Sequence, residues 1–439
     1  MLIKIKGGRV IDPGRLDTIV DIIVQDDKIL ALMAPGQAAA PNTERRASEA
    51  PSQTIDASGK IVCPGLIDMH VHLREPGGEH KETIETGAGA AAWGGFTAVC
   101  CMPNTDPVND NCGVTEFILS KAARAREARV YPVGAISVGL AGRELGAFER
   151  LQACGVVALS DDGNPVMDDS LMQRALVAAH ALELPVISHC EDLNQAATGV
   201  MNAGPVAVEL NLAGISNASE SVMVERDIAL SKATGAPVHI AHVSTAESVA
   251  ALRTAKSEGL PVTAETAPHY FLLTDAAVRE WGTHAKMNPP LRSETDRAAI
   301  RQGLADGTID VIATDHAPHS DREKAVAFEL AANGIIGLET AVSLSLKLVH
   351  ENVISITELI AKMSTHPARI LGLECGLQPG GTADITIIDP DVVYEVDANR
   401  FQSMSRNCPF DGWRLTGRPV LTMVGGRVVY HGLKELKDS

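Results

Sequence analysis

Short apolar segments alternate with alanine-rich stretches through the middle of the chain, from about residue 60 to residue 375. Apolar runs of this kind predict buried parallel strands, and the stretches between them predict helices, most clearly at Val114–Glu127, Ser170–Leu182 and Ser219–Thr234. Eight strand–helix repeats over about 300 residues predict a TIM-type (β/α)8 barrel. The predicted strands end near His72, Met102, Gly134, Ser160, His189, His242, Glu265 and Asp315.

Both ends of the chain carry strand patterns instead, at residues 2–5 and 19–24 and again at residues 383–388 and 420–430. The run Gly7-Gly8-Arg9 resembles Gly425-Gly426-Arg427, which predicts two hairpins with similar glycine turns.

The fold class expected is therefore α/β, a (β/α)8 barrel with a small β-sandwich built from both termini. The expected boundaries are 1–58 for the N-terminal part of the sandwich, 59–377 for the barrel and 378–439 for the C-terminal part. A doubly wound open sheet is the competing fold, but no phosphate-binding glycine loop follows an early strand.

Composition excludes several classes of partner. The 439 residues carry 38 Lys and Arg against 55 Asp and Glu, a formal charge of −17, and only 3% aromatics. A nucleic-acid or anionic-membrane surface needs clustered cations, and base stacking needs aromatic side chains. The uncharged stretch Thr86–Thr105 is rich in glycine and predicts a small-residue helix followed by a buried strand rather than a membrane span. With no secretory signal and no CxxC pair, we expect a cytoplasmic protein with reduced thiols.

Metal-binding side chains follow five of the predicted strands. His70 and His72 stand two residues apart, so both imidazoles reach the same side of a strand. Imidazole with carboxylate suits zinc or a similar divalent ion. Six candidate ligands exceed one four- or five-coordinate site, and so the sequence predicts two ions with a bridging carboxylate. Water held between two cations ionises near neutral pH and becomes a nucleophile. The candidates are His70, His72, Asp162, His189, His242 and Asp315, with Asp161 as the alternative to Asp162.

In order along the chain, these motifs resemble those of the cyclic amidohydrolases, and among them the bacterial class I dihydroorotases. The resemblance covers nearly the whole chain, and its strongest stretches are DMHVHLREPG (68–77), CCMPNTDP (100–107), SDDG (160–163), SHCED (188–192), HVSTAES (242–248), AETAPHYFLLTD (264–275), KMNPPLR (286–292) and ATDHAPH (313–319). The resemblance implies reversible cyclisation of N-carbamoyl-L-aspartate to L-dihydroorotate in pyrimidine biosynthesis.

The resemblance also assigns roles. It implies one zinc held by His70, His72 and Asp315, a second held by His189 and His242, and Asp162 as the bridge. It makes Asp315 the catalytic acid and base as well. It implies that substrate is held by His72, Arg74, Asn104, Asn288, His319, Asn333 and Gly334.

Two alternatives remain beside this interpretation. One is a hydantoinase-like or allantoinase-like enzyme. Hydantoinases and allantoinases bridge their metals through a carbamylated lysine. This chain has no lysine between Lys121 and Lys232, which favours an aspartate bridge. The other is a non-catalytic partner of aspartate transcarbamoylase, although the full ligand set is present. The sequence leaves open a homodimer and a complex with that transcarbamoylase.

Overall fold

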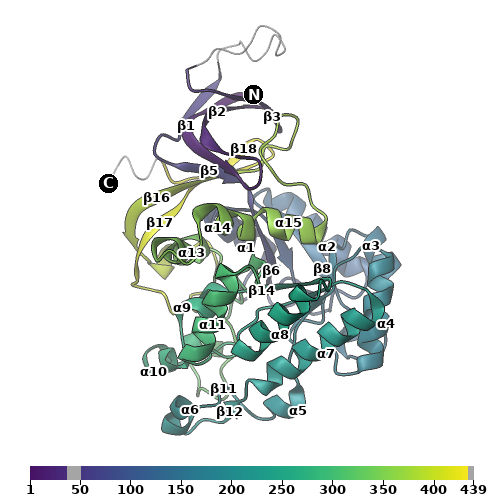
Figure 1. The fold of residues 1–439 in the computed structure, drawn as a ribbon. Coiled ribbons are helices and arrows are strands. Elements are labelled where there is room, and N and C mark those ends of the chain that lie inside the picture. The colour runs from purple at the N-terminus through teal and green to yellow at the C-terminus, as the bar shows by residue number, and fades with distance from the viewer. Residues whose placement is uncertain (37–50, 434–439) are drawn as a thin grey trace.

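Eight parallel strands form the centre of the larger part of the structure, a computed structural model that describes residues 1–36 and 51–433 (Figure 1). Buried apolar residues fill these strands, which explains why the sequence pattern located them. They are β6 (Leu66–Val71), β7 (Phe96–Cys101), β8 (Arg129–Gly134), β9 (Ala158–Leu159), β10 (Ile187–Ser188), β13 (Val238–Ile240), β14 (Val262–Thr266) and β15 (Val311–Ile312).

The strands close into a barrel. Two arcs, β6-β7-β8-β9 and β10-β13-β14-β15, pair in parallel. A parallel bridge between Leu159 and Val186 joins the arcs on one side, and a bridge between Val71 and His316 joins them on the other. The backbone N–H of His72 donates to the carbonyl of His316 at 2.8 Å, so strand one and strand eight meet at the carboxyl end of the barrel.

Helices between the strands cover the outside of the barrel, and side-chain caps begin several of them. Asn111 and Asp168 each accept a backbone N–H at the start of α2 and α4. The longer helices are α1 (Ile84–Trp93), α2 (Cys112–Ala125), α4 (Asp169–Ala181), α7 (Ala218–Thr234), α8 (Ala246–Ser257), α11 (Glu294–Ala305), α13 (Ala341–His350), α14 (Ile356–Met363) and α15 (Thr365–Leu371). Shorter elements are α3 (Phe148–Ala153), α5 (Leu193–Ala196), β11 (Met201–Asn202), α6 (Pro205–Leu210), β12 (Gly214–Ile215), α9 (Pro268–Leu272), α10 (Val278–Trp281) and α12 (Asp321–Lys324).

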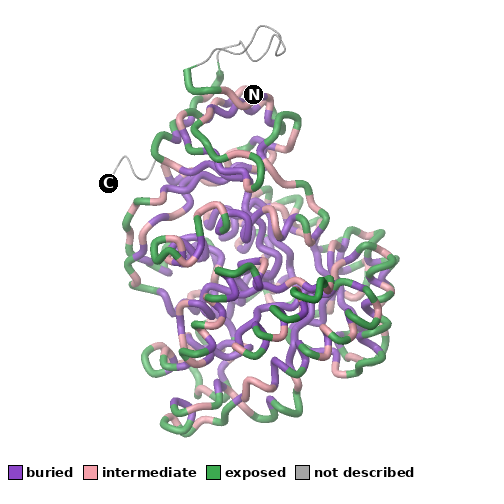
Figure 2. The backbone as a smooth tube through the Cα atoms, viewed as in Figure 1, coloured by how far each residue is buried: buried purple, intermediate pink, exposed green. Residues whose placement is uncertain are grey.

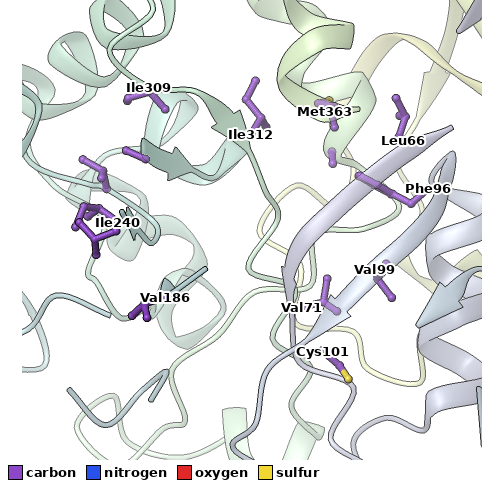
Figure 3. Packing of buried hydrophobic residues seen from close by; sticks show 14 of the residues in the cluster. Leu66, Val71, Phe96, Val99, Cys101, Val186, Ile240, Ile309, Ile312 and Met363 are labelled. Carbon is purple, nitrogen blue, oxygen red and sulfur yellow. The ribbon is translucent and has the colours of Figure 1, made fainter. Parts of the chain in front are cut away.

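The barrel core has two layers because successive strand residues face opposite ways. Val71, Val99 and Cys101 belong to a large cluster between the strands and the helices (Figure 3). Ala98 and Cys100 belong to a separate buried cluster on the other face of the same strand. Buried backbone therefore runs through the strands, while exposed residues follow the outer helices (Figure 2).

Both termini form the smaller part, as the sequence predicts. Its strands are β1 (Leu2–Asp12), β2 (Leu16–Gln25), β3 (Lys28–Met33), β4 (Gln53–Asp56), β5 (Ile61–Pro64), β16 (Ile385–Glu395), β17 (Arg414–Val424) and β18 (Arg427–His431). They are hydrogen-bonded in the order β18-β17-β16-β5-β1-β2-β3, with β4 also paired to β1. Ile5, Val62, Ile387 and Leu421 share its core. The boundaries 1–58, 59–377 and 378–439 stay a prediction; in the structure, β5 lies in this sheet and β6 follows it after Gly65.

Two expectations about local structure are wrong. Gly425 and Gly426 do form the turn between β17 and β18, but Gly7 and Gly8 lie inside β1, where the pairing with β2 shifts register. The glycines there occupy a bulge rather than a hairpin turn. Not all thiols are reduced either, because Cys112 and Cys154 form a disulfide between the start of α2 and the end of α3. Their Cα atoms lie 5.6 Å apart, a spacing that suits a disulfide.

The stretch Thr86–Thr105 folds largely as predicted, into most of α1 followed by β7. Across residues 1–36 and 51–433, no helix combines the length and the apolar character that crossing a bilayer requires.

Candidate metal centre and substrate cavity

Six predicted ligands come together at the carboxyl end of the barrel. They arrive from five strands, which is why residues 245 positions apart in sequence meet at one place. All six are buried: His70, His72, Asp162, His189, His242 and Asp315.

Asp162 stands between two groups of ligands. The first group is His70, His72 and Asp162, and the second group is Asp162, His189 and His242. Within each group the ligand atoms lie within 4.8 Å of one another. Asp162 Oδ1 lies 3.3 Å from His70 Nε2 and 3.5 Å from both His189 Nδ1 and His242 Nε2. One carboxylate therefore faces both groups.

Asp315 lies beside the first group. Its Oδ1 is 3.1 Å from His72 Nε2 and 3.6 Å from His70 Nε2. Its backbone has φ +49°, a left-handed conformation that a non-glycine residue adopts at some cost. Burial alone would raise the pKa of Asp315, but the hydrogen bond with His72 and the charge of neighbouring histidines hold it below its ordinary value.

These residues fit divalent cations. His70 Nε2 and Asp162 Oδ1 are buried and have no hydrogen-bond partner, a costly arrangement that a cation between them would satisfy. Burial alone would lower the pKa of His70, but Asp162 and Glu265 raise it well above its ordinary value. The site is therefore built to receive positive charge, and imidazole nitrogen with carboxylate oxygen is the donor set that zinc-type ions prefer.

Asp161 and Asp162 have different environments. Asp161 accepts hydrogen bonds from the backbone N–H groups of Ile136 and Ser137, at 2.8 and 3.0 Å, and from the Ser137 hydroxyl. It ties the end of β9 to the segment after β8. Of the two neighbours, only Asp162 lies among the histidines.

A cavity of about 270 Å³ opens next to the two groups. Every residue that the sequence assigns to substrate lines it: His72, Arg74, Asn104, Asn288, His319, Asn333 and Gly334. Asp162, His189, His242 and Asp315 also line it, so a ligand in the cavity would touch both groups.

Arg74 supplies the positive charge in this cavity. It lies beyond the end of β6, with φ +61°, so its direction comes from a left-handed turn rather than from strand alternation. Its Nε donates to the carbonyl of Pro318 at 3.1 Å. Burial lowers the pKa of Arg74 to about 10, which leaves the guanidinium charged at neutral pH.

The loop around Pro318 and His319, which Arg74 contacts, is held by a residue that the sequence did not single out. Asn407 is buried and donates to the carbonyls of Ala317 and Gly334, at 2.9 and 3.0 Å. Its Oδ1 accepts the backbone N–H of His319 at 3.2 Å. Nε2 of His319 in turn donates to the carbonyl of Asn333 at 2.7 Å. An asparagine near the C-terminus offers no sequence signal for this role.

Comparison with known proteins agrees with this architecture. The family model described as Dihydro-orotase-like matches residues 59–248. L-hydantoinase (dihydropyrimidinase) from Arthrobacter aurescens has a similar structure, with a TM-score of 0.87, 27% identity, and coverage of 98% of this chain and 96% of that one. The barrel, its small sheet and its histidine- and aspartate-lined cavity define a cyclic amidohydrolase.

Sequence relatives narrow the class. The dihydroorotase of Desulforapulum autotrophicum is 56% identical over 98% of this chain and 99% of the relative. The dihydroorotase of Syntrophus aciditrophicus is 50% identical over the same shares of the two chains. The chain belongs to the dihydroorotase family.

Proposed function

We propose that this chain is a zinc-dependent dihydroorotase, which cyclises N-carbamoyl-L-aspartate to L-dihydroorotate and water, and the reverse, in pyrimidine biosynthesis. The observation that carries the proposal is one cavity in which a partly buried, charged Arg74 faces two ligand groups that share Asp162. A substrate with a carboxylate at one end and an amide at the other matches those two features.

Two zinc ions are proposed, one for each group. His70, His72 and Asp315 would hold the first, His189 and His242 would hold the second, and Asp162 would contact both. Bound there, the ions would supply Lewis acidity towards the amide carbonyl and lower the pKa of a bound water.

The side chains around the cavity would fix the orientation of the substrate. Arg74 can grip a carboxylate through two parallel N–H bonds, and its Nε is already fixed on Pro318. Asn104, Asn288 and His319 would add hydrogen bonds, with the backbone at Asn333 and Gly334 closing the far side. Held at both ends, the substrate presents its amide carbon to the two groups.

Asp315 is proposed as the acid and base. In ring opening its carboxylate would take a proton from the attacking water and deliver it to the departing ring nitrogen. In ring closure the same carboxylate would take a proton from the ureido nitrogen. Its place in the cavity, in contact with His72, supports this role.

Location and assembly follow as part of the same proposal. We propose a cytoplasmic location, and a homodimer and a complex with aspartate transcarbamoylase as the assemblies to test.

Ring opening of dihydroorotate, assayed beside zinc content, tests the proposal. We expect two zinc ions per chain and turnover that a chelator removes and zinc restores. Preferred turnover of a hydantoin would instead favour a hydantoinase. Zinc binding without turnover of either ring would favour a non-catalytic partner.

A further inference from the structure

Each histidine in the two groups has two ring nitrogens, and only one of them can face an ion. The other nitrogen carries a proton in the neutral ring, and an acceptor placed there decides which nitrogen is left for the metal. The acceptors behind the histidines therefore determine the geometry of the centre as much as the ligands do.

Glu265 lies behind His70. It lies near the end of β14, is 1% exposed, and its Oε1 lies 2.6 Å from Nδ1 of His70. His239 fixes the other oxygen, with Nε2 3.3 Å from Oε2, and Thr263 lies 2.8 Å from the far nitrogen of His239. The carboxylate is thus held from the barrel interior, and Nε2 of His70 points towards Asp162.

Glu191 lies behind His189, but it contacts Nε2 of that ring, whereas Glu265 contacts Nδ1 of His70. Its Oε2 is 3.3 Å from Nε2 of His189 and accepts a hydrogen bond from Asn288 at 3.0 Å. That leaves Nδ1 of His189 facing inward, 2.7 Å from Nε2 of His242 and 3.5 Å from Asp162. His70 therefore offers Nε2 to its group, whereas His189 offers Nδ1 to the other.

We propose that Glu265 and Glu191 are positioning residues, each of which fixes the ring of one histidine for one metal: Glu265 for the first group and Glu191 for the second. The inference rests on the proposed function, because it requires metal at both groups. Neither glutamate lines the substrate cavity. Glu191 also accepts a hydrogen bond from Asn288, which does line it, so zinc affinity rather than turnover measures the effect through His189.

Zinc affinity is the direct measurement. Zinc-loaded wild-type protein and the Glu265→Gln and Glu191→Gln variants are titrated with a chromophoric chelator that resolves the two ions. We expect each variant to release one of its two ions at about 10- to 100-fold lower chelator concentration than wild type, and to hold the other normally. Alanine at either position removes the acceptor altogether, and so it should weaken the same ion further.

Glu339→Gln is the matched control. Glu339 is also a buried glutamate, but it accepts backbone N–H groups of Gln402 and Ser403, away from both groups. If replacing any buried glutamate with glutamine weakened zinc binding by a general effect on the fold, all three variants would lose zinc affinity alike. The proposal requires normal affinity for both ions in the control.

Histidine ¹⁵N NMR of the zinc-loaded proteins gives a second readout that does not depend on activity. We expect His70 to carry its proton on Nδ1 and His189 on Nε2. The hydrogen-bonded His70 proton should shift upfield in Glu265→Gln and stay in place in Glu191→Gln.

If wild type binds zinc and both variants bind it with unchanged affinity, this inference is wrong and the proposed function stands. The same holds if each variant loses both ions equally. Absence of zinc binding by the wild-type protein would overturn the proposed function and this inference together.

Discussion

Nδ1 of His72 donates a hydrogen bond to Oδ1 of Asn104 at 2.9 Å. The family resemblance assigns Asn104 to substrate and His72 to both metal and substrate, and the structure links the two side chains directly. By accepting this proton, Asn104 turns Nε2 of His72 towards Asp162 and Asp315. A residue that lines the cavity therefore also orients a proposed metal ligand.

Asn104→Ala and Asn104→Asp separate these two roles. Alanine removes the acceptor, so we expect zinc affinity to fall by about 10- to 100-fold. Aspartate keeps an acceptor but puts negative charge beside an anionic substrate, so we expect near-normal zinc content with KM raised by about tenfold or more, the equivalent of about 1.4 kcal/mol. Chelator titration and steady-state kinetics distinguish them; equal zinc loss in both variants would contradict the division.

Asp161 and Asp162 give a second comparison. Asp162→Ala should lower zinc content and turnover together, because the shared carboxylate is lost. Asp161→Ala should instead reduce stability by about 1–3 kcal/mol while the folded protein keeps its zinc. It leaves the buried N–H of Ser137 unpaired and leaves the N–H of Ile136 only its long bond to the carbonyl of Ser160, at 3.4 Å. Two tightly held ions and normal turnover in Asp162→Ala would refute the bridging role.

These two aspartates also show what sequence can and cannot predict. Strand ends were located correctly because an apolar run ends abruptly where polar side chains enter the mouth of the barrel. The strand pattern alone does not distinguish neighbouring aspartates at such an end, because Asp161 is recognised only by its partners after β8; the preference for Asp162 comes from the family resemblance. Gly7 and Gly8 were misassigned for a similar reason, since a bulge and a hairpin turn both use glycine.

Arg74 stands two residues after His72 and lines the cavity, yet β6 ends at Val71 and a left-handed backbone directs the side chain. Glu265 was noted only as the end of a strand. Its proposed function depends on His70 and His239, which two other strands bring into contact with it. No local sequence pattern indicates those contacts.

Asp315→Asn tests proton transfer. The amide keeps the size of the side chain and an oxygen near His72 but cannot accept the proton. We expect ring opening and ring closure to slow by at least about 10²-fold in protein that retains zinc. Normal turnover in metal-replete Asp315→Asn would remove Asp315 from this role.

Buried Glu339 predicts a pH effect on stability that is independent of the metal centre. Burial raises its pKa from the ordinary 4.5 to about 8. Between these two pKa values the folded state therefore holds one more proton than the unfolded state. The contribution of this proton to the free energy of unfolding is lost as pH rises through 8. Urea unfolding should show Glu339→Gln gaining stability relative to wild type from pH 5 to pH 9, by a few kcal/mol at about 1.4 kcal/mol per pH unit. A difference that stays constant with pH would show that Glu339 is ionised throughout.

Specificity for the substrate carboxylate is the most direct test of the central claim. Dihydrouracil is the dihydroorotate ring without its carboxylate, so turnover of both rings is measured on zinc-loaded wild type and Arg74→Ala. We predict strong preference of the wild type for dihydroorotate. In Arg74→Ala, dihydroorotate turnover should fall by about 30- to several-thousand-fold, as expected when a buried charge pair loses one partner, while the small dihydrouracil rate hardly changes. Equal losses on both rings, or a wild-type preference for dihydrouracil or a hydantoin, would contradict the account.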